Sequence, residues 1–245
     1  MDKQHKVALV TGASRGIGAA VARRLGQDGY SVVVNYARNE GEAQAVVESL
    51  RAHGGAALAV RADVADPAQV RALFYAAQAA FGGLDVLVNN AGVLATAPLA
   101  QAGDASFAQT FAVNVQGSFN TMREAATRLR EGGRVINFST SVLAMNLPGY
   151  GVYSASKAAV EALTRVFARE LRGRRVTVNA VAPGPVATEL FMAGKSPEQV
   201  AHFASQAPLE RLGETADIAG VVSFLAGPDG AWVNGQVLRA NGGIA

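Results

Sequence analysis

The sequence contains no cysteine among its 245 residues. This absence excludes disulfide bonds and thiolate metal sites, and it fits a chain that resides in a reducing compartment. Histidine is scarce as well, since His5, His53 and His202 lie far apart and share no ligand spacing. We therefore expect no metal site.

Long apolar runs and a strong charge imbalance are also missing. No stretch of about 18 apolar residues is present, and the first residues, MDKQHKVALVTG, lack the hydrophobic region of a signal peptide. The net charge is only +3, and the basic residues are scattered without a known nucleic-acid-binding motif. The sequence thus predicts a soluble, cytoplasmic protein whose partners include neither membranes nor nucleic acids.

Apolar residues, in contrast, are abundant at 50% of the chain, enough for a large core. Continuous β-branched runs, typical of strands buried on both faces of a parallel sheet, cover 6–12, 31–36, 57–64, 84–92, 133–141, 176–184 and 235–240. Ala-rich helical stretches alternate with them and cover 16–28, 40–53, 67–81, 104–130, 152–172 and 214–226. The alternation predicts an α/β fold, a Rossmann-type doubly wound parallel sheet of about seven strands, in a single domain over 1–245.

Ligands of such sheets bind beyond the carboxyl ends of the strands. The first strand ends in TGASRGIG, which places Gly12, Gly16 and Gly18 at the turn into a helix. Gly12 allows a tight turn, Gly16 lets the backbone approach a pyrophosphate, and Gly18 permits close packing of the helix. At this position in an alternating α/β pattern, the three glycines predict a dinucleotide site.

The end of the second strand indicates which dinucleotide fits. An NAD site usually carries Asp or Glu there, to bind the ribose 2′-hydroxyl, and here Asn35 stands near that position. Arg15 and Arg38 add positive charge that suits a 2′-phosphate, although a single Arg is more often a solvated surface residue. We predict NADP(H) as the cofactor.

The stretch YGVYSASK, residues 150–157, pairs Tyr153 with Lys157 on one helical face. A cation at ~5 Å in an effective dielectric of ~20 contributes about 3 kcal/mol, which would lower the pKa of a tyrosine by roughly two units from its usual value of about 10. We therefore expect the pKa of Tyr153 to lie near the working range of a general acid. Tyr150 has Ser154 at the matching spacing and is interpreted as a pocket wall or a core residue.

With NNAG at 89–92, NVQG around Asn114, the Tyr-x-x-x-Lys pair and APGPVATELF, the whole chain resembles a short-chain dehydrogenase/reductase. Within that family it is most similar to the 3-oxoacyl carrier-protein reductase and trihydroxynaphthalene-reductase-like group. The resemblance implies that Tyr153 donates a proton to a substrate carbonyl while the nicotinamide gives hydride to its carbon. It also implies that Lys157 binds the nicotinamide ribose and that Asn114 holds a water in a proton relay.

The resemblance further implies a serine 13 residues before the tyrosine, whose hydroxyl binds the carbonyl oxygen. Thr140 occupies that position, between Ser139 and Ser141. Thr140 supplies the hydroxyl directly, or a small shift of the loop brings in Ser141, which we favour.

The family pattern extends the cofactor site to contacts with the adenine from Asp63 and Val64 and with the carboxamide from Thr188. The residues expected to bind the cofactor are Gly12, Ser14, Arg15, Gly16, Ile17, Gly18, Asn35, Tyr36, Arg38, Asp63, Val64, Asn90, Ala91, Gly92, Tyr153, Lys157, Pro183, Gly184, Val186 and Thr188.

The expected function is an NADPH-dependent reductase that converts a ketone to a secondary alcohol. Its small-molecule substrate would be a 3-oxoacyl thioester or a hydrophobic aryl or alicyclic ketone, shaped by apolar residues of 93–99, 142–150 and 187–208. These residues are Leu94, Leu143, Met145, Leu147, Tyr150, Leu190, Phe191, Met192 and Phe203. The alternative is a dinucleotide-sensing regulator that has kept the fold and lost catalysis, against which Asn114, Tyr153 and Lys157 argue.

By analogy with the family, we expect a homotetramer, or else a homodimer. The helical stretches 104–130 and 152–172 would form one interface, and GAWVNGQVLRANGGIA at the end of the chain a second. The outer faces of these helices are expected to include Phe107, Phe111, Phe119, Val160, Leu163 and Phe167. The competing interpretation is that all six side chains face the sheet.

Overall fold

The structure is a computed structural model that describes residues 6–245. Its described part contains one sheet of seven parallel strands in the order β3-β2-β1-β4-β5-β6-β7. The strands are β1 (Val7–Val10), β2 (Ser31–Tyr36), β3 (Ala57–Arg61), β4 (Leu84–Asn89), β5 (Leu129–Phe138), β6 (Thr177–Pro183) and β7 (Val237–Ala240). The predicted doubly wound sheet is confirmed.

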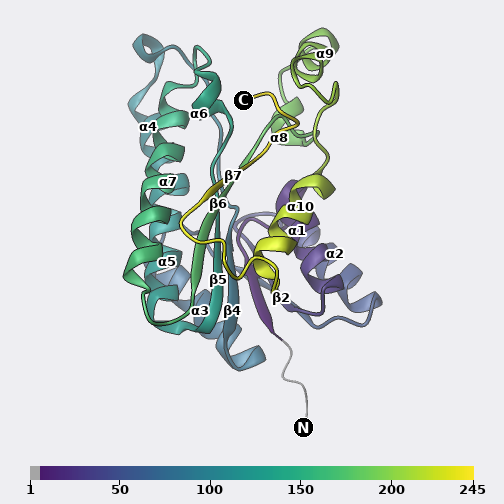
Figure 1. Ribbon diagram of the computed structural model, residues 1–245, viewed down its shortest axis with the longest axis vertical. Helices are drawn as coiled ribbons and strands as arrows, with labels where there is room; N and C mark the ends of the chain where they lie inside the picture. Colours follow the sequence, from purple (N-terminus) through teal and green to yellow (C-terminus); the bar gives the residue numbers. More distant parts are fainter. Residues whose placement is uncertain (1–5) are drawn as a thin grey trace.

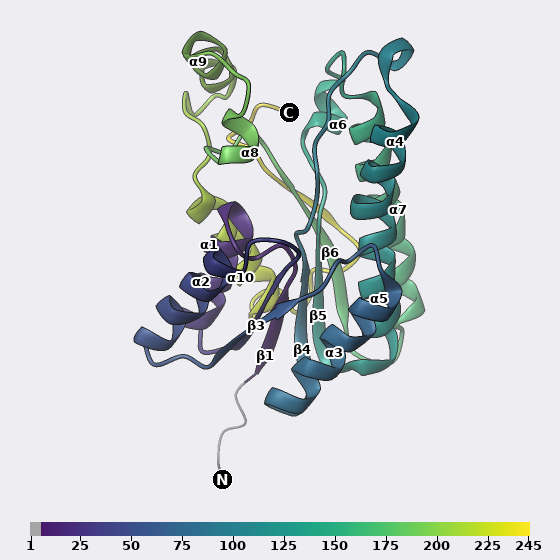
Figure 2. The same ribbon diagram turned by 180° about the vertical axis from the view of Figure 1, so that it is seen from behind.

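Helices cover both faces of the sheet (Figures 1 and 2). One layer consists of α1 (Gly16–Gln27), α2 (Glu40–Ala52) and α10 (Thr215–Ala226). The opposite layer consists of α3 (Pro67–Phe81), α4 (Asp104–Phe111), α5 (Gly117–Arg128) and α7 (Gly151–Glu170). This three-layer arrangement buries the strands from both sides, as their continuous apolar runs require.

Successive residues of β1 face opposite sides of the sheet and belong to two separate core clusters. Ala8 and Val10 belong to the cluster beneath α1 and α10, whereas Val7 and Leu9 belong to the cluster beneath α3 and α5. Side chains alternate between the faces of a strand, so both sets must be apolar when both faces are covered. All four residues are completely buried.

Three short helices lie beyond the carboxyl ends of the strands. They are α6 (Val142–Met145), α8 (Glu189–Met192) and α9 (Pro197–Gln206). In Figure 1, α8 and α9 stand on one side of the upper end of the molecule, and α4 and α6 stand on the other. The sequence patterns did not predict these three helices, although Ser196 caps α9 through a reciprocal capping box with Gln199.

The predicted helix over 104–130 is interrupted. α4 ends at Phe111, a π-helical turn covers Ala112–Gln116, and α5 begins at Gly117. The following strand starts earlier than predicted, at Leu129, and the register between β4 and β5 shifts between Leu84 and Val86. The short 3₁₀ helix Leu99–Gln101, which the sequence patterns do not predict either, precedes α4.

Two residues assigned to the outer face of α7 are instead buried. Val160 is completely buried and Phe167 nearly so, because together with Thr164 they form the i, i+4, i+7 stripe that faces the sheet. Phe111 and Leu163 are half-buried, and Phe107 and Phe119 are exposed as predicted. Part of the predicted interface is therefore core.

Candidate active site

Two connected cavities lie at the carboxyl ends of the strands. The larger, about 780 Å³, runs over the glycine turn, the end of β2 and the residues after β3 and β4. The smaller, about 170 Å³, is enclosed by the ends of β5 and β6, α6 and the start of α7. The residues that line both are Ile17, Asn90, Gly92, Val93, Thr188 and Leu190. The arrangement provides a long groove that opens into a small apolar chamber.

The glycine turn has the shape that the sequence predicted. Gly12 and Gly16 adopt positive φ angles of 59° and 55°, which strain residues with a side chain. A Cβ on Gly18 would lie 2.3 Å from the carbonyl oxygen of Gly12 and 2.4 Å from Nδ2 of Asn90. The start of α1 thus lies directly against the turn, and its first residues, Gly16, Ile17 and Gly18, line the groove.

Hydrogen bonds from the end of β4 hold this turn. Asn90 Nδ2 donates to the carbonyl oxygens of Thr11 and Gly12, both at 2.9 Å. The hydroxyl of Thr11 accepts from the amides of Asn90 and Ala91, both at 3.0 Å. Thr11 was not among the predicted residues, and its place one residue before Gly12 was the available signal.

Asn35 lies buried below the turn. Its Oδ1 accepts from the Gly12 amide at 3.3 Å, and its Nδ2 donates to the carbonyl oxygens of Val60 and Ala62 at 3.3 and 3.0 Å. An aspartate could not donate these two bonds. The side chain therefore supports the groove from below and brings no carboxylate to it.

Cations surround the adjacent end of the groove. Arg38 lines the groove, is exposed, and forms no ion pair within residues 6–245. Arg15 also lines it, and its Nη1 lies 3.0 Å from Oε2 of Glu189, the first residue of α8. Arg61, which the sequence analysis did not include, donates from Nε to the Ala37 carbonyl at 3.3 Å.

The other predicted cofactor residues are distributed between the two cavities. The groove is lined by Gly12, Ser14, Gly16, Ile17, Gly18, Asn35, Tyr36, Asp63, Val64, Asn90, Ala91, Gly92 and Thr188. Tyr153, Lys157, Pro183, Gly184 and Val186 line the small cavity. Together the glycine turn without side chains, the start of α1 and the nearby arginines fit a phosphorylated dinucleotide.

Tyr153 and Lys157 both reach the small cavity from α7. Lys157 Nζ donates to the Phe138 carbonyl at 2.8 Å and lies 5.9 Å from the centroid of the Tyr153 ring. Burial raises the pKa of Tyr153 to about 12, and it lowers the pKa of Lys157 to about 8. The pKa of Tyr153 was expected to be lowered by Lys157, but in the chain by itself it is raised, because burial is the largest influence on it.

The Thr140 side chain interacts with the phenol of Tyr153. Its hydrogen bond with Tyr153 acts against the effect of burial on the tyrosine pKa. Ser141, the residue that the sequence analysis favours, instead donates from Oγ to the Ala182 carbonyl at 3.0 Å and accepts from Asn241 Nδ2 at 3.0 Å. Ser139 donates to Glu161 Oε1 at 2.7 Å. Of the three neighbouring hydroxyls, Thr140 is the one paired with Tyr153.

Asn114 lies in the π turn and is almost completely buried. Its Oδ1 accepts from the Val93 amide at 2.8 Å, and its Nδ2 donates to the Val93 carbonyl and to Ser156 Oγ, both at 3.0 Å. Ser156 donates in turn to the Tyr153 carbonyl at 2.7 Å. Ser156, which no sequence pattern indicated, connects Asn114 to the helix that carries Tyr153.

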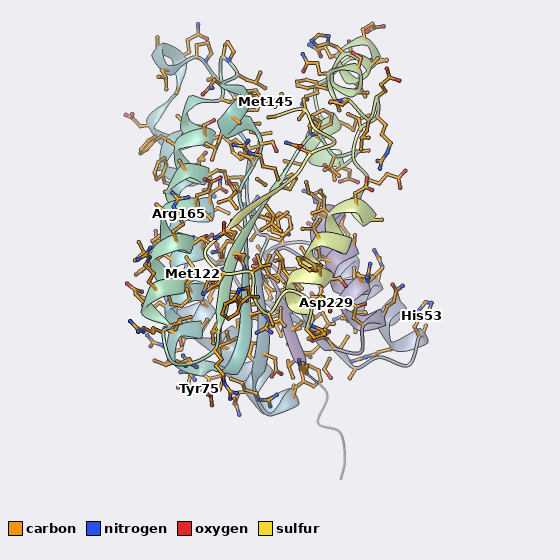
Figure 3. The ribbon with its side chains drawn as sticks, viewed as in Figure 1. His53, Tyr75, Met122, Met145, Arg165 and Asp229 are labelled. Carbon is orange, nitrogen blue, oxygen red and sulfur yellow. The ribbon has the colours of Figure 1, made fainter. Side chains whose placement is uncertain are left out.

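Five of the nine apolar residues predicted to shape the substrate site line the small cavity, namely Leu94, Met145, Tyr150, Leu190 and Phe191. Phe203 lies behind Phe191, with ring centroids 5.4 Å apart. Tyr150 packs edge-on against Tyr153 at 6.4 Å, which agrees with its interpretation as a pocket wall. Leu143, Leu147 and Met192 are not in the lining. Figure 3 shows Met145 at the open end of the fold and Tyr75 at the opposite end.

Within residues 6–245, no group of three or more His, Cys, Asp or Glu side chains is arranged to hold a metal ion. His53 lies at the outer end of α2, far from the cavities (Figure 3), and His5 is outside the described residues. Among the helices that the structure describes, none is long and apolar enough to cross a membrane.

Comparisons with known proteins agree with this geometry. The family model described as Enoyl-(Acyl carrier protein) reductase matches residues 12–245. The chain is 48% identical to a Short-chain type dehydrogenase/reductase of Picea abies, over 97% of this chain and 92% of that protein. It is 43% identical to a chloroplastic NADPH-dependent aldehyde reductase-like protein of Arabidopsis thaliana, over 97% and 93%. A blue fluorescent protein from a metagenomic library, solved in complex with NADPH, superimposes with a TM-score of 0.94 at 40% identity, and the match covers 100% of both chains.

Proposed function

The chain belongs to the short-chain dehydrogenase/reductase family, and from that membership and the site geometry we propose that it reduces a hydrophobic ketone to a secondary alcohol. It is an NADP-dependent oxidoreductase, and its cofactor is NADP(H). The observation that carries the proposal is the meeting of Thr140, Tyr153 and Lys157 in a small apolar cavity that opens from the dinucleotide groove.

The cofactor would lie in the groove, with its phosphates at the start of α1. The glycine turn and the amides of α1 would hold the pyrophosphate, and Arg15 and Arg38 would receive the 2′-phosphate. When bound, NADPH supplies the hydride. The absence of a carboxylate at the end of β2 supports a preference over NADH, since Asn35 is engaged with the backbone.

Tyr153 would donate its phenolic proton to the substrate oxygen as the carbonyl becomes an alkoxide. Since burial raises the pKa of Tyr153 to about 12, the phenol remains protonated through the neutral range. A protonated phenol is the form that donates a proton to the substrate oxygen in a reduction. The Thr140 hydroxyl would donate a second hydrogen bond to the same oxygen.

Lys157 and Asn114 would restore the proton to Tyr153. A pKa of about 8 lets Lys157 gain and lose a proton close to neutral pH. Asn114 is fixed by Val93 and Ser156, and a Cβ on Gly92 would lie 3.3 Å from Asn114 Oδ1 and 3.5 Å from Lys157 Nζ, so the three residues are adjacent. This adjacency supports a relay from the interior to the groove.

The substrate we propose is an aryl or alicyclic ketone, or the ketone end of a 3-oxoacyl thioester. The small cavity is walled by Leu94, Met145, Tyr150 and Phe191, and Pro185 completes it. These side chains offer contact area and few hydrogen bonds to a substituent. The name of the Arabidopsis relative, an aldehyde reductase, supports carbonyl reduction in general.

We also propose that the chain forms a homotetramer. Phe107 and Phe119 are 49% and 45% exposed on α4 and α5, and Trp232, before the edge strand β7, is 97% exposed. Aromatic residues are enriched in protein–protein interfaces, so these side chains support two separate subunit contacts. Light scattering at micromolar concentration should give about four times the 25.2 kDa subunit mass, and a monomer would contradict the proposal.

The experiment that tests the function is an NADPH-consumption screen over aryl ketones, quinones, acetoacetyl thioesters and sugars. We expect turnover with hydrophobic ketones and none with sugars, and a kcat/KM for NADPH that exceeds the value for NADH. Arg38→Ala should reduce that ratio by about ten-fold. Turnover confined to sugars, or equal use of both nucleotides, would contradict the proposal.

A further inference from the structure

The segment 241–245 follows β7 and runs back over the carboxyl ends of the strands, to the space between α6 and α8 (Figure 1). There it contacts the turn 140–142, which carries the Thr140 hydroxyl. Asn241 Nδ2 donates to Ser141 Oγ at 3.0 Å and to the Ala245 carbonyl at 2.8 Å. A single amide nitrogen therefore joins two segments 100 residues apart.

Ser141 has no freedom to act on a substrate in this arrangement. It is almost completely buried, its Oγ donates to the Ala182 carbonyl at 3.0 Å, and its amide donates to the Pro183 carbonyl at 2.9 Å. With the bond from Asn241, its hydroxyl both donates and accepts. The role left for Ser141 is to fix the turn against the end of β6.

Fixing Ser141 also fixes Thr140. The Thr140 Oγ1 accepts from the Val142 amide at 3.2 Å, on the other side of Ser141, and the Thr140 side chain lowers the pKa of Tyr153 against the effect of burial. A rotation of the peptide at Ser141 would therefore turn the Thr140 hydroxyl away from the phenol. The bonds of Ser141 are the restraint against that rotation.

Asn241 is itself held from two sides. Its Oδ1 accepts from the Gly243 amide at 2.9 Å, and a Cβ on Gly184 would lie 2.8 Å from Asn241 Cα. The neighbouring Gly242 carbonyl accepts from the Leu209 amide at 3.4 Å, just after α9. The segment 241–245 thus connects the catalytic turn with the elements that cover the substrate side.

We propose that Asn241 is a positioning residue for the reduction, and that it acts through Ser141 to aim the Thr140 hydroxyl at the substrate oxygen. The inference rests on the proposed function of Thr140 and Tyr153. Among the described residues, Asn241 forms no hydrogen bond with the side chain of Thr140 or Tyr153, so its effect must pass through the turn. The amide is required because Nδ2 donates twice while Oδ1 accepts once, which an aspartate cannot do.

The test compares kcat, the KM for NADPH and the unfolding free energy of Asn241→Ala, Ser141→Ala and the double variant. We expect each single change to lower kcat by about ten-fold, as small misplacements of catalytic groups do, and to leave the KM for NADPH within two-fold. Because both residues act on one turn, the double variant should be no slower than either single variant.

Asn234→Ala is the matched control. Asn234 also bonds a strand backbone, since its Oδ1 accepts from the Val178 amide at 2.8 Å, but it lies before β7, at the other end of that strand. We expect it to lower stability and to preserve kcat. Should Asn241→Ala fail to fold, Asn241→Asp, which keeps the size of the side chain, takes its place and should lower kcat in the same way.

Three results would overturn the inference. The first is a kcat for the Asn241 variants within two-fold of the native value, and the second is a decrease in kcat no greater than that of Asn234→Ala. The third is a kcat of the double variant that is lowered by the product of the two single effects. If the native chain reduces none of the carbonyls, the proposed function fails, and amide hydrogen exchange of 139–145 decides the inference separately. Faster exchange there in Asn241→Ala and Ser141→Ala but not in Asn234→Ala supports it, and unchanged exchange overturns it.

Discussion

The two sides of the groove are built in different ways. The cofactor side, which we define as 11–18 together with 89–92, is cross-linked by hydrogen bonds of the Thr11, Asn35 and Asn90 side chains. The substrate side, 187–208, consists of two short helices with exposed apolar side chains, among them Leu190 at 55% and Met192 at 43%. Side-chain hydrogen bonds tie the first side to the ends of β2 and β4, whereas most hydrogen bonds of the second side are local, within or next to its short helices.

This difference indicates where mutations could change the substrate specificity without loss of the catalytic reaction. A hydrogen-bonded turn with no space for a Cβ tolerates few substitutions, so the cofactor and the hydride geometry are fixed together. Exposed apolar residues on short helices tolerate many, so the choice of ketone can vary while the proton donor stays in place. Mutations on the two sides should therefore differ in both size and kind.

The largest effect should come from Tyr153, the proposed proton donor between the two sides. Tyr153→Phe removes one hydroxyl and leaves the glycine turn unchanged, so we expect kcat to fall by about 10²–10⁴-fold with NADPH affinity preserved. Steady-state kinetics and titration of NADPH fluorescence measure the two quantities. Retention of more than about a tenth of kcat would show that Tyr153 is not the proton donor.

Lys157, a buried cation of α7 that lies on neither side, allows a test of stability. Burial lowers its pKa from 10.5 to about 8. Below pH 8 both folded and unfolded chains carry the charge, and between pH 8 and 10.5 the unfolded chain binds more protons, so stability rises with pH in that window. Relative to Lys157→Met, the native chain should gain on the order of 3 kcal/mol of unfolding free energy from pH 7.5 to 10.5.

Urea unfolding of both chains at each pH checks this expectation. The subtraction removes most of the contribution of Tyr153, whose raised pKa acts in the opposite direction above pH 10. A difference in unfolding free energy that does not vary with pH would show that Lys157 is solvated.

Gly18→Ala tests the cofactor side directly. Its Cβ would lie 2.3 Å from the Gly12 carbonyl oxygen, so the turn must move, and we expect the Kd for NADPH to rise by at least about ten-fold. Gly41→Ala is the matched control, since a Cβ on this residue of α2 would have open space around it. The control should leave Kd unchanged and stabilise the chain by about 0.5–1 kcal/mol. Equal effects of the two changes would contradict the comparison.

The smallest effect should come from the substrate side. Leu190→Ala shortens an exposed side chain that lines both cavities, so we expect the KM for the ketone to change by about three-fold with kcat within two-fold. Kinetics with a small and a large aryl ketone measure the change. A loss of kcat comparable to that of Tyr153→Phe would show that the substrate side also positions the reacting groups.

Sequence patterns predicted the fold, and they predicted that Tyr153 and Lys157 lie on one helical face, for physical reasons. Continuous apolar strands can only be buried on both faces, and a Tyr-x-x-x-Lys spacing in a helix places both side chains on one face. Val160 and Phe167 were expected on the outer face of α7 but face the sheet. In a sequence, apolar residues on a helix look the same whether they pack against the sheet or against another subunit.

Other features depend on tertiary contacts that no local pattern contains. Thr140 and Ser141 are adjacent hydroxyls, and only the positions of Ala182 and Asn241 decide which of them turns toward β6. The sign of the pKa shift of Tyr153 depends on how completely the ring leaves water, which the spacing to Lys157 does not reveal. Arg15 was expected to be available for a phosphate, and its partner Glu189 lies 174 residues away.

The π turn Ala112–Gln116 has a consequence for insertions and deletions. A π turn contains one residue more than an α-helical turn, so deleting one residue here would join α4 and α5 into a regular helix. The flanking helices would keep their orientation, because the deleted residue is the extra one that the π turn holds. The change would fall on the turn itself, where Asn114 would leave its hydrogen bonds to Val93 and Ser156. The number of residues in this helix is therefore fixed by the site, even though the shorter chain would form the better helix.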